Sequence, residues 1–129
     1  MSETPMTRQL SAEEMRRYRH SAEMRYLADQ AQRDLRCQRA WQLARQAAAL
    51  LKAQYGVSRV VAFGSLTHPG RFTRWSDLDL AARGLTAGNW LRAMSAVRAL
   101  SDEIDINLVD VACCSPELAT SILRDGVTL

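Results

Sequence analysis

The sequence lacks the features that mark secreted, membrane-spanning and zinc-binding proteins. It holds three cysteines, an odd number, and two of them, Cys113 and Cys114, are adjacent, which makes a poor disulfide framework. No C-x-x-C pair or Cys/His cluster offers a zinc site. No apolar run reaches the length that spans a bilayer, and the first ten residues do not combine a charged segment with an apolar one. These absences predict a soluble protein of the cytoplasm with no membrane partner.

A strong excess of charge of one sign is also missing. The formal net charge is +3, and it belongs to residues 1–55, where ten Lys and Arg face six Asp and Glu; residues 56–129 carry seven against eight. The basic residues of the first segment alternate with acidic ones, as on an ordinary solvated helix, and no aromatic residues form a platform with them. Nucleic acid is therefore not an expected partner.

Glycine and proline are absent from residues 11–55, where Ala, Arg, Gln, Glu and Leu dominate. This composition predicts a helix, with Ser11 as its N-cap, Glu14 at the capping-box position and Gly56 as its stop. A single helix of this length would measure about 67 Å, more than a small domain can cover. The helix is therefore expected either to break or to project.

The two halves of this predicted helix differ in apolar content. Residues 36–55 carry the denser stripe, which predicts packing on the domain; its members are Trp41, Leu43, Ala44, Ala47, Ala48, Leu50 and Leu51. Residues 11–32 carry a thinner stripe that includes Met15, Tyr18 and Leu27. This half suits a partner protein, a second copy of the chain in a homo-oligomer, or a frayed arm.

Short strands and helices replace the long helix after Gly56. Apolar or alternating segments at residues 58–63, 76–82 and 103–111 predict strands, and helical spacing marks residues 90–100. A last helix is expected from Ser115, its cap, to Gly126. The order predicts an α+β fold, an α/β sandwich in which helices flank a small sheet at residues 56–129, with residues 1–55 as a helical extension.

Two aspartates stand one residue apart on the second predicted strand. Asp77 and Asp79 project from one face, because residues i and i+2 of a strand point the same way. Carboxylates this close repel each other unless a cation neutralises them, and Mg²⁺ prefers carboxylate oxygens together with water and phosphate. Asp105, on the third strand, could complete a site for two metal ions about 4 Å apart. The alternative is an exposed sheet face that carries solvated acids.

A Gly-Ser dipeptide ends the first predicted strand. Gly64 lets the backbone pass close to a bulky anion, while the following amides and the Ser65 hydroxyl can donate to phosphate oxygens. A turn that serves only geometry is the alternative. Beside the paired acids, the dipeptide predicts a phosphate cradle next to a metal site.

The segments "FGSLTHPGRFTRWSDLDLA" and "IDINLVD" together resemble the minimal nucleotidyltransferases of the DNA polymerase beta superfamily. That family combines Gly-Ser, a loop, Asp-x-Asp and a third acid on a later strand, and its fold contains a small mixed sheet. By this resemblance Gly64 and Ser65 would hold a nucleoside triphosphate such as ATP, and Asp77 and Asp79 would bind Mg²⁺. Asp105 would complete the catalytic metal site and help to activate the attacking hydroxyl.

The loop between the two motifs departs from the family pattern. Eleven residues separate Ser65 from Asp77, one more than is usual, and Leu66 stands where many members have Arg. Arg71 or Arg74 is expected to neutralise phosphate charge in its place. These departures concern the loop more than the metal ligands.

The chain is too short to supply an acceptor site of its own, since residues 56–129 are needed for the core of this fold. The resemblance implies a helical HEPN-type toxin as the partner, and an antitoxin that transfers AMP from ATP to a hydroxyl of that toxin, typically of tyrosine. The chain has no R-x4-6-H motif, the HEPN nuclease signature, so it would be the transferase half. Two alternatives stay open: an antitoxin that neutralises its partner by binding alone, and nucleotidyl transfer to a small hydroxylated molecule.

Overall fold

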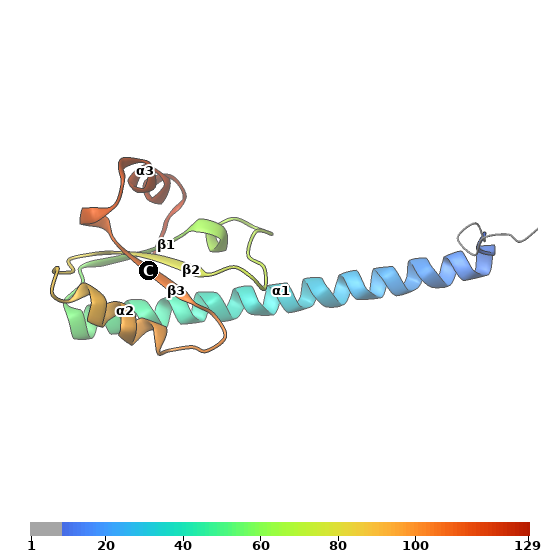
Figure 1. The fold of residues 1–129 in the computed structure, drawn as a ribbon, viewed down its shortest axis with the longest axis horizontal. Coiled ribbons are helices and arrows are strands. Elements are labelled where there is room, and N and C mark those ends of the chain that lie inside the picture. The colour runs from blue at the N-terminus through green and yellow to red at the C-terminus, as the bar shows by residue number, and fades with distance from the viewer. Residues whose placement is uncertain (1–8) are drawn as a thin grey trace, which may run out of the picture. The chain divides into compact units, whose positions relative to one another are not determined.

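The computed structural model describes residues 9–129, so the first eight residues of the expected extension at residues 1–55 lie outside the described part. Its elements follow the expected order of helix, strand, strand, helix, strand and helix (Figure 1). They are α1 (Ala12–Tyr55), β1 (Arg59–Phe63), the 3-10 helix η2 (Gly64–Thr67), β2 (Leu78–Arg83), α2 (Trp90–Arg98), β3 (Ile106–Asp110), the 3-10 helix η3 (Val111–Cys113), α3 (Pro116–Asp125) and β4 (Val127–Thr128).

The chain divides into two compact units, one ending at Gln32 and one spanning Arg33–Leu129. Helix α1 has no break over its 44 residues. Its start follows the sequence signal, because the Ser11 hydroxyl accepts a hydrogen bond from the Glu14 N–H at 3.0 Å. Among the described helices, none is both long and apolar enough to cross a membrane.

The sheet of the second unit is mixed, as predicted. Its strand order is β3-β2-β1-β4, with β1 antiparallel to β2 and β4, and β2 parallel to β3. The two-residue strand β4 was not predicted; it extends the edge of the sheet beside β1. Successive side chains of each strand point to opposite faces, so the sheet has two apolar sides that both need a cover.

Helices cover both faces of this sheet (Figure 1). The second half of α1 and helix α2 pack on one face, against β1, β2 and β3. Helix α3 packs on the other face through Ile122, which belongs to a buried cluster with Val61, Phe63 and Ala81. The predicted α/β sandwich is confirmed.

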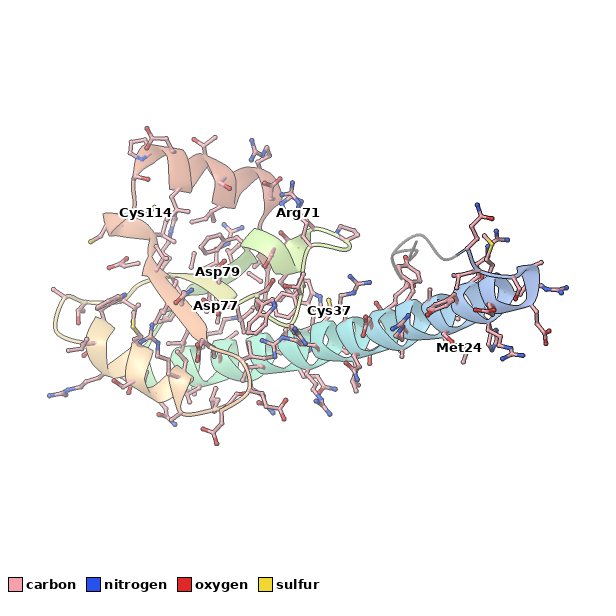
Figure 2. All side chains as sticks on the ribbon, turned by 45° about the vertical axis from the view of Figure 1, so that its right-hand side comes forward. Met24, Cys37, Arg71, Asp77, Asp79 and Cys114 are labelled. Carbon is pink, nitrogen blue, oxygen red and sulfur yellow. The ribbon has the colours of Figure 1, made fainter. Side chains whose placement is uncertain are left out.

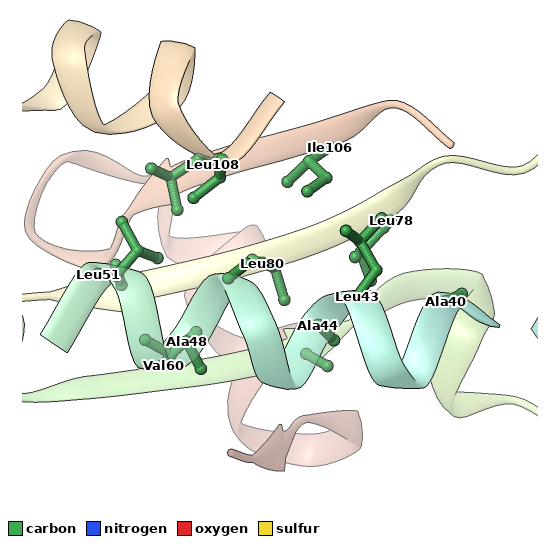
Figure 3. Close-up of a cluster of buried hydrophobic side chains, with 14 of the residues drawn as sticks. Ala40, Leu43, Ala44, Ala48, Leu51, Val60, Leu78, Leu80, Ile106 and Leu108 are labelled. Carbon is green, nitrogen blue, oxygen red and sulfur yellow. The ribbon is translucent and has the colours of Figure 1, made fainter. Parts of the chain in front are cut away.

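Small side chains dominate the face of α1 that packs on the sheet (Figure 3). The buried residues of α1 are Ala40, Leu43, Ala44, Ala47, Ala48 and Leu51. Opposite them, the strands bury Val60, Leu78, Leu80, Ile106 and Leu108. The expectation that residues 36–55 pack on the domain is confirmed, with Trp41 and Leu50 partly buried at the margin.

Removal of residues 1–32 should leave the fold of residues 33–129 intact. Every buried residue of the described chain lies at or after Ala40, so the truncation removes no described core residue. We expect the melting temperature, measured by circular dichroism, to stay within about 5 °C of that of the full chain, since 1 kcal/mol corresponds to roughly 4–8 °C in a small domain. A loss of cooperative melting would contradict this expectation.

Candidate active site around Asp77 and Asp79

Asp77 directly precedes β2 and Asp79 is the second residue of that strand; both are labelled in Figure 2. Asp77 is exposed and Asp79 is half-buried. The parallel register pairs Asp79 with Asn107 of β3. The Asn107 side-chain amide donates from Nδ2 to Asp77 Oδ2 at 3.3 Å and to Asp79 Oδ1 at 3.2 Å. One amide group thus joins the two carboxylates.

The surroundings of Asp79 make its charge costly. Burial raises the pKa of the Asp79 carboxyl; the hydrogen bond from Asn107 acts in the opposite direction, and the negative charge of Asp77 adds to the rise. A raised pKa means that the folded protein holds this carboxylate less readily in its ionised form. The site therefore favours any group that brings positive charge or donates hydrogen bonds to Asp79.

Gly64 follows β1 and faces this carboxylate across the antiparallel register, in which Phe63 pairs with Asp79. Its φ is +76°, a conformation that suits glycine. A Cβ added at Gly64 would collide with Asp79 Oδ2 and lie 3.3 Å from Asp79 Cγ. Glycine is therefore required here for two independent reasons, backbone conformation and space.

Ser65 comes next, in the short helix η2, and is half-buried. The turn is fixed by two hydrogen bonds: the Thr67 hydroxyl donates to the Gly64 carbonyl at 3.0 Å, and the His68 N–H donates to the Ser65 carbonyl at 3.2 Å. The predicted Gly-Ser dipeptide and the predicted Asp-x-Asp pair are thus brought together, with Gly64 in contact with Asp79.

A single arginine of α1 holds the loop that leads to the carboxylates. Arg36 donates to the main-chain carbonyls of Thr73 at 3.1 Å, Ser76 at 3.2 Å and Glu103 at 3.2 Å. Its guanidinium also lies 5.7 Å from the centre of the buried Phe72 ring. Within the loop the Thr73 N–H donates to the Ser76 hydroxyl at 2.9 Å. Since Ser76 directly precedes Asp77, these bonds fix the position of the backbone from which the Asp77 side chain projects.

Side chains of α2 hold β3, the strand that carries Asn107. β3 is an edge strand, so one side of its backbone has no strand partner. Arg98 Nε donates to the Ile106 carbonyl at 3.0 Å, and Trp90 Nε1 donates to the Leu108 carbonyl at 3.2 Å. Asn107 lies between these two anchored positions, so its backbone is held on both sides.

Asp105, the predicted third acid, lies just before β3 and is exposed. Its main-chain carbonyl accepts a hydrogen bond from the Leu78 N–H at 2.9 Å. In the described part of the chain, no three His, Cys, Asp or Glu side chains are close enough together to hold one metal ion. The structure brings Asn107, which sequence reasoning missed, to the paired aspartates and does not bring Asp105 into the same group.

The missed residue left a weak signal in the sequence. Asn107 stands two positions after Asp105, so both belong to one face in a period-two pattern. Only the register between β2 and β3 decides which of them lies opposite Asp79, and the sequence does not contain that register.

The two arginines predicted to neutralise phosphate charge are both exposed on the loop before Asp77. The guanidinium of Arg74 lies 4.8 Å from the centre of the Trp75 ring, in a cation–π contact. A role for Arg71 or Arg74 toward phosphate stays a prediction.

The oxygen atoms gathered at this site fit a magnesium ion. Asp77 and Asp79 supply carboxylates, and the Asn107 side chain has an amide oxygen that could serve as a further ligand. Mg²⁺ is usually held by one or two carboxylates plus water and substrate phosphates, so two acids are enough for one ion. The predicted second ion needs a third carboxylate, and the role of Asp105 in holding it stays a prediction.

No protein-family model and no curated protein matches the sequence. Solved structures do match. A toxin–antitoxin MntA–HepT structure is 18% identical and covers 68% of this chain and 69% of that chain, with a TM-score of 0.52. A variant of that pair has Asp-to-Glu replacements at two positions separated by one residue. It is 19% identical and covers 66% of this chain and 70% of that chain, with a TM-score of 0.56. A toxin–antitoxin structure with AMP-PNP is 23% identical and covers 61% of this chain and 64% of that chain, with a TM-score of 0.52.

These matches show that the chain shares its fold with a chain of the MntA–HepT toxin–antitoxin structures. At this level of identity the likeness concerns the fold. The predicted fold class is confirmed.

The space beside Asp79 can be tested by replacing Gly64. Gly64→Ala should destabilise the protein more than Gly70→Ala, because both positions have positive φ, +76° and +79°, while only the Cβ at position 64 meets the Asp79 carboxylate. The strain at φ alone costs about 1–2 kcal/mol in both variants. Urea denaturation would measure the difference, and equal losses would contradict the proposed close approach.

The bonds made by Arg36 predict a second comparison. Arg36→Ala should lower the free energy of unfolding by about 2–3 kcal/mol, since three charge-assisted hydrogen bonds to main-chain carbonyls are lost. Arg39→Ala is the matched control on the same helix, because Arg39 makes an exposed ion pair with Glu103 at 3.3 Å, a type of contact worth about 0–1 kcal/mol. The same denaturation curves decide; equal effects would mean that Arg36 does not hold the loop.

Proposed function

We propose that this protein is an antitoxin that transfers AMP from ATP, with the help of Mg²⁺, to a hydroxyl of a HEPN-type toxin, most simply that of a tyrosine. The observation that carries the proposal is the close approach of Gly64 to Asp79, which places a turn suited to phosphate beside two carboxylates suited to a cation. The fold, shared with structures of toxin–antitoxin pairs, supports the choice of partner. A related structure that contains AMP-PNP supports ATP as substrate.

The reaction assigns a role to each part of the site. The acceptor hydroxyl oxygen attacks the α-phosphorus of ATP, a new P–O bond forms, and the bond to the oxygen that bridges the α- and β-phosphates breaks. Pyrophosphate leaves with that electron pair, and the hydroxyl proton passes to water or to a carboxylate of the site. Gly64 and Ser65 would hold the phosphates through main-chain amides and the serine hydroxyl, and Asp77 and Asp79 would hold Mg²⁺. The bound ion would neutralise charge on the phosphates during transfer.

The proposal places the acceptor hydroxyl on another molecule, the toxin. In this proposal residues 56–129 form the catalytic core, and the extension at residues 1–55 supplies the second half of α1 to that core. Apolar side chains of the first unit are available for binding the toxin or a second copy of the chain: Met15, Tyr18 and Leu27 are 42%, 62% and 57% exposed. Aromatic and large aliphatic side chains of this kind anchor protein interfaces.

A second candidate function is neutralisation of the toxin by binding alone. The observation that favours it is the presence of Asn107 beside the two aspartates, with Asp105 outside the group. A site with two carboxylates has less negative charge with which to hold metal and to accept a proton. In that case the protein would capture its partner without modifying it.

Replacement of either aspartate separates these functions. Asp77→Asn or Asp79→Asn should abolish transfer of radiolabel from α-labelled ATP to the co-purified toxin, because each change removes a metal-binding charge. The melting temperature should not fall, since repulsion between the two carboxylates is relieved. Asp102→Asn, an exposed position outside the site, is the control and should transfer normally.

Full transfer by both aspartate variants would exclude the proposed site. Capture of the toxin by the wild-type protein without any labelling would instead favour neutralisation by binding.

A further inference from the structure

Asn107 occupies a position between the two carboxylates that a cation would use. Within residues 9–129, both Asp77 and Asp79 take their side-chain hydrogen bonds from its Nδ2 atom, at 3.3 Å and 3.2 Å. An amide N–H carries partial positive charge and is a donor, while a metal ion needs a lone pair. The donor side of Asn107 therefore reduces the repulsion between the carboxylates and is unable to bind metal.

The same side chain carries an oxygen that can bind metal. A rotation of the terminal amide by about 180° exchanges Nδ2 and Oδ1 at nearly the same volume, and this torsion has a broad, roughly two-fold profile. The backbone on both sides of Asn107 is fixed, because the carbonyls of Ile106 and Leu108 are held by Arg98 and Trp90. Movement at this point is thus confined to the side chain.

We propose that Asn107 is a gate for the cation at this site: Mg²⁺ enters when the Asn107 amide turns from its donor side, which holds the two carboxylates, to its oxygen, which becomes a ligand. The proposal deepens the proposed function and rests on the magnesium part of it. Loading of the ion requires the loss of two hydrogen bonds, so the asparagine weakens ion binding compared with a carboxylate at the same position. Asn107 then sets the metal affinity of the site without taking part in the transfer of the nucleotide.

The chain offers a matched pair of variants for this idea, because it contains two asparagines, Asn89 and Asn107. Asn107→Asp adds a third carboxylate beside the pair, whereas Asn89→Asp adds the same charge at the start of α2. Calorimetric titration with Mg²⁺ alone should show that Asn107→Asp binds the ion at least about fivefold more tightly than the wild type. Asn89→Asp should show no comparable change. A smaller increase, or weaker binding, would overturn the proposal.

Thermal melting of the same variants gives a second readout. In the presence of EDTA, Asn107→Asp should melt at a lower temperature than the wild type, because two hydrogen bonds are replaced by repulsion among three carboxylates. Added Mg²⁺ should restore more of the melting temperature in this variant than in the wild type or in Asn89→Asp. An equal response to Mg²⁺ in all three proteins would count against the gate.

The wild-type protein tests the rotation without any substitution. In ¹⁵N-resolved NMR spectra, the signals of the Asn107 side-chain NH₂ group can be assigned by their loss in Asn107→Ala. These signals should shift as Mg²⁺ is added, while those of Asn89 should not. Saturation by Mg²⁺ with an unmoved Asn107 pair, or no binding of Mg²⁺ at all, would overturn the proposal. Because these measurements need neither ATP nor toxin, a working gate in a protein that transfers no AMP would refute the proposed function alone.

Discussion

Alanine side chains on the second half of α1 allow its backbone to lie close to the sheet, and the position of the candidate site depends on this contact. Ala40, Ala44 and Ala47 are fully buried against the strands. Larger side chains at these positions would have to push the helix away, because interiors of proteins are close-packed. Arg36 lies one turn before this stripe, where it reaches three main-chain carbonyls of the loops at the site. The helix therefore both completes the core and positions the segment that ends at the carboxylates.

The carboxylate pair itself works against stability, and the core has to offset that cost. The pKa of Asp79 is raised in the folded protein, first by burial, so the folded state binds a proton more readily than the unfolded chain. Stability from this group is fully present at pH below its ordinary pKa and is lost as pH rises through the raised value. At pH above its raised pKa, the Asp79 carboxylate is therefore held ionised at some expense. The Asn107 amide reduces the expense, and a cation would reduce it further.

Local signals in the sequence predicted much of this structure. Ser11 and Ser115 cap their helices as expected, with accepted N–H bonds at 3.0 Å and 3.2 Å, and Gly56 ends α1 with a positive φ. The neighbourhood of Gly64 and the Asp-x-Asp pair was also predicted, because two short motifs on neighbouring strands carry it. Each of these features depends on residues that are close in sequence, where propensity and spacing are informative.

The features that the sequence did not predict all depend on long-range pairing. The placement of Asn107 opposite Asp79 follows from the register between β2 and β3, and the period-two pattern alone fits Asp105 equally well. The hydrogen bonds from Arg36 to the loop join positions 37 and 40 residues apart. The alternation of basic and acidic residues in the first segment of the sequence does not reveal such bonds. A register shift of one residue reverses the face of every side chain, whereas a shift of two keeps the face and changes the partner. A shift of two residues therefore decides whether the Asp105 carboxylate or the Asn107 amide lies opposite Asp79. That choice sets how strongly the site attracts a cation.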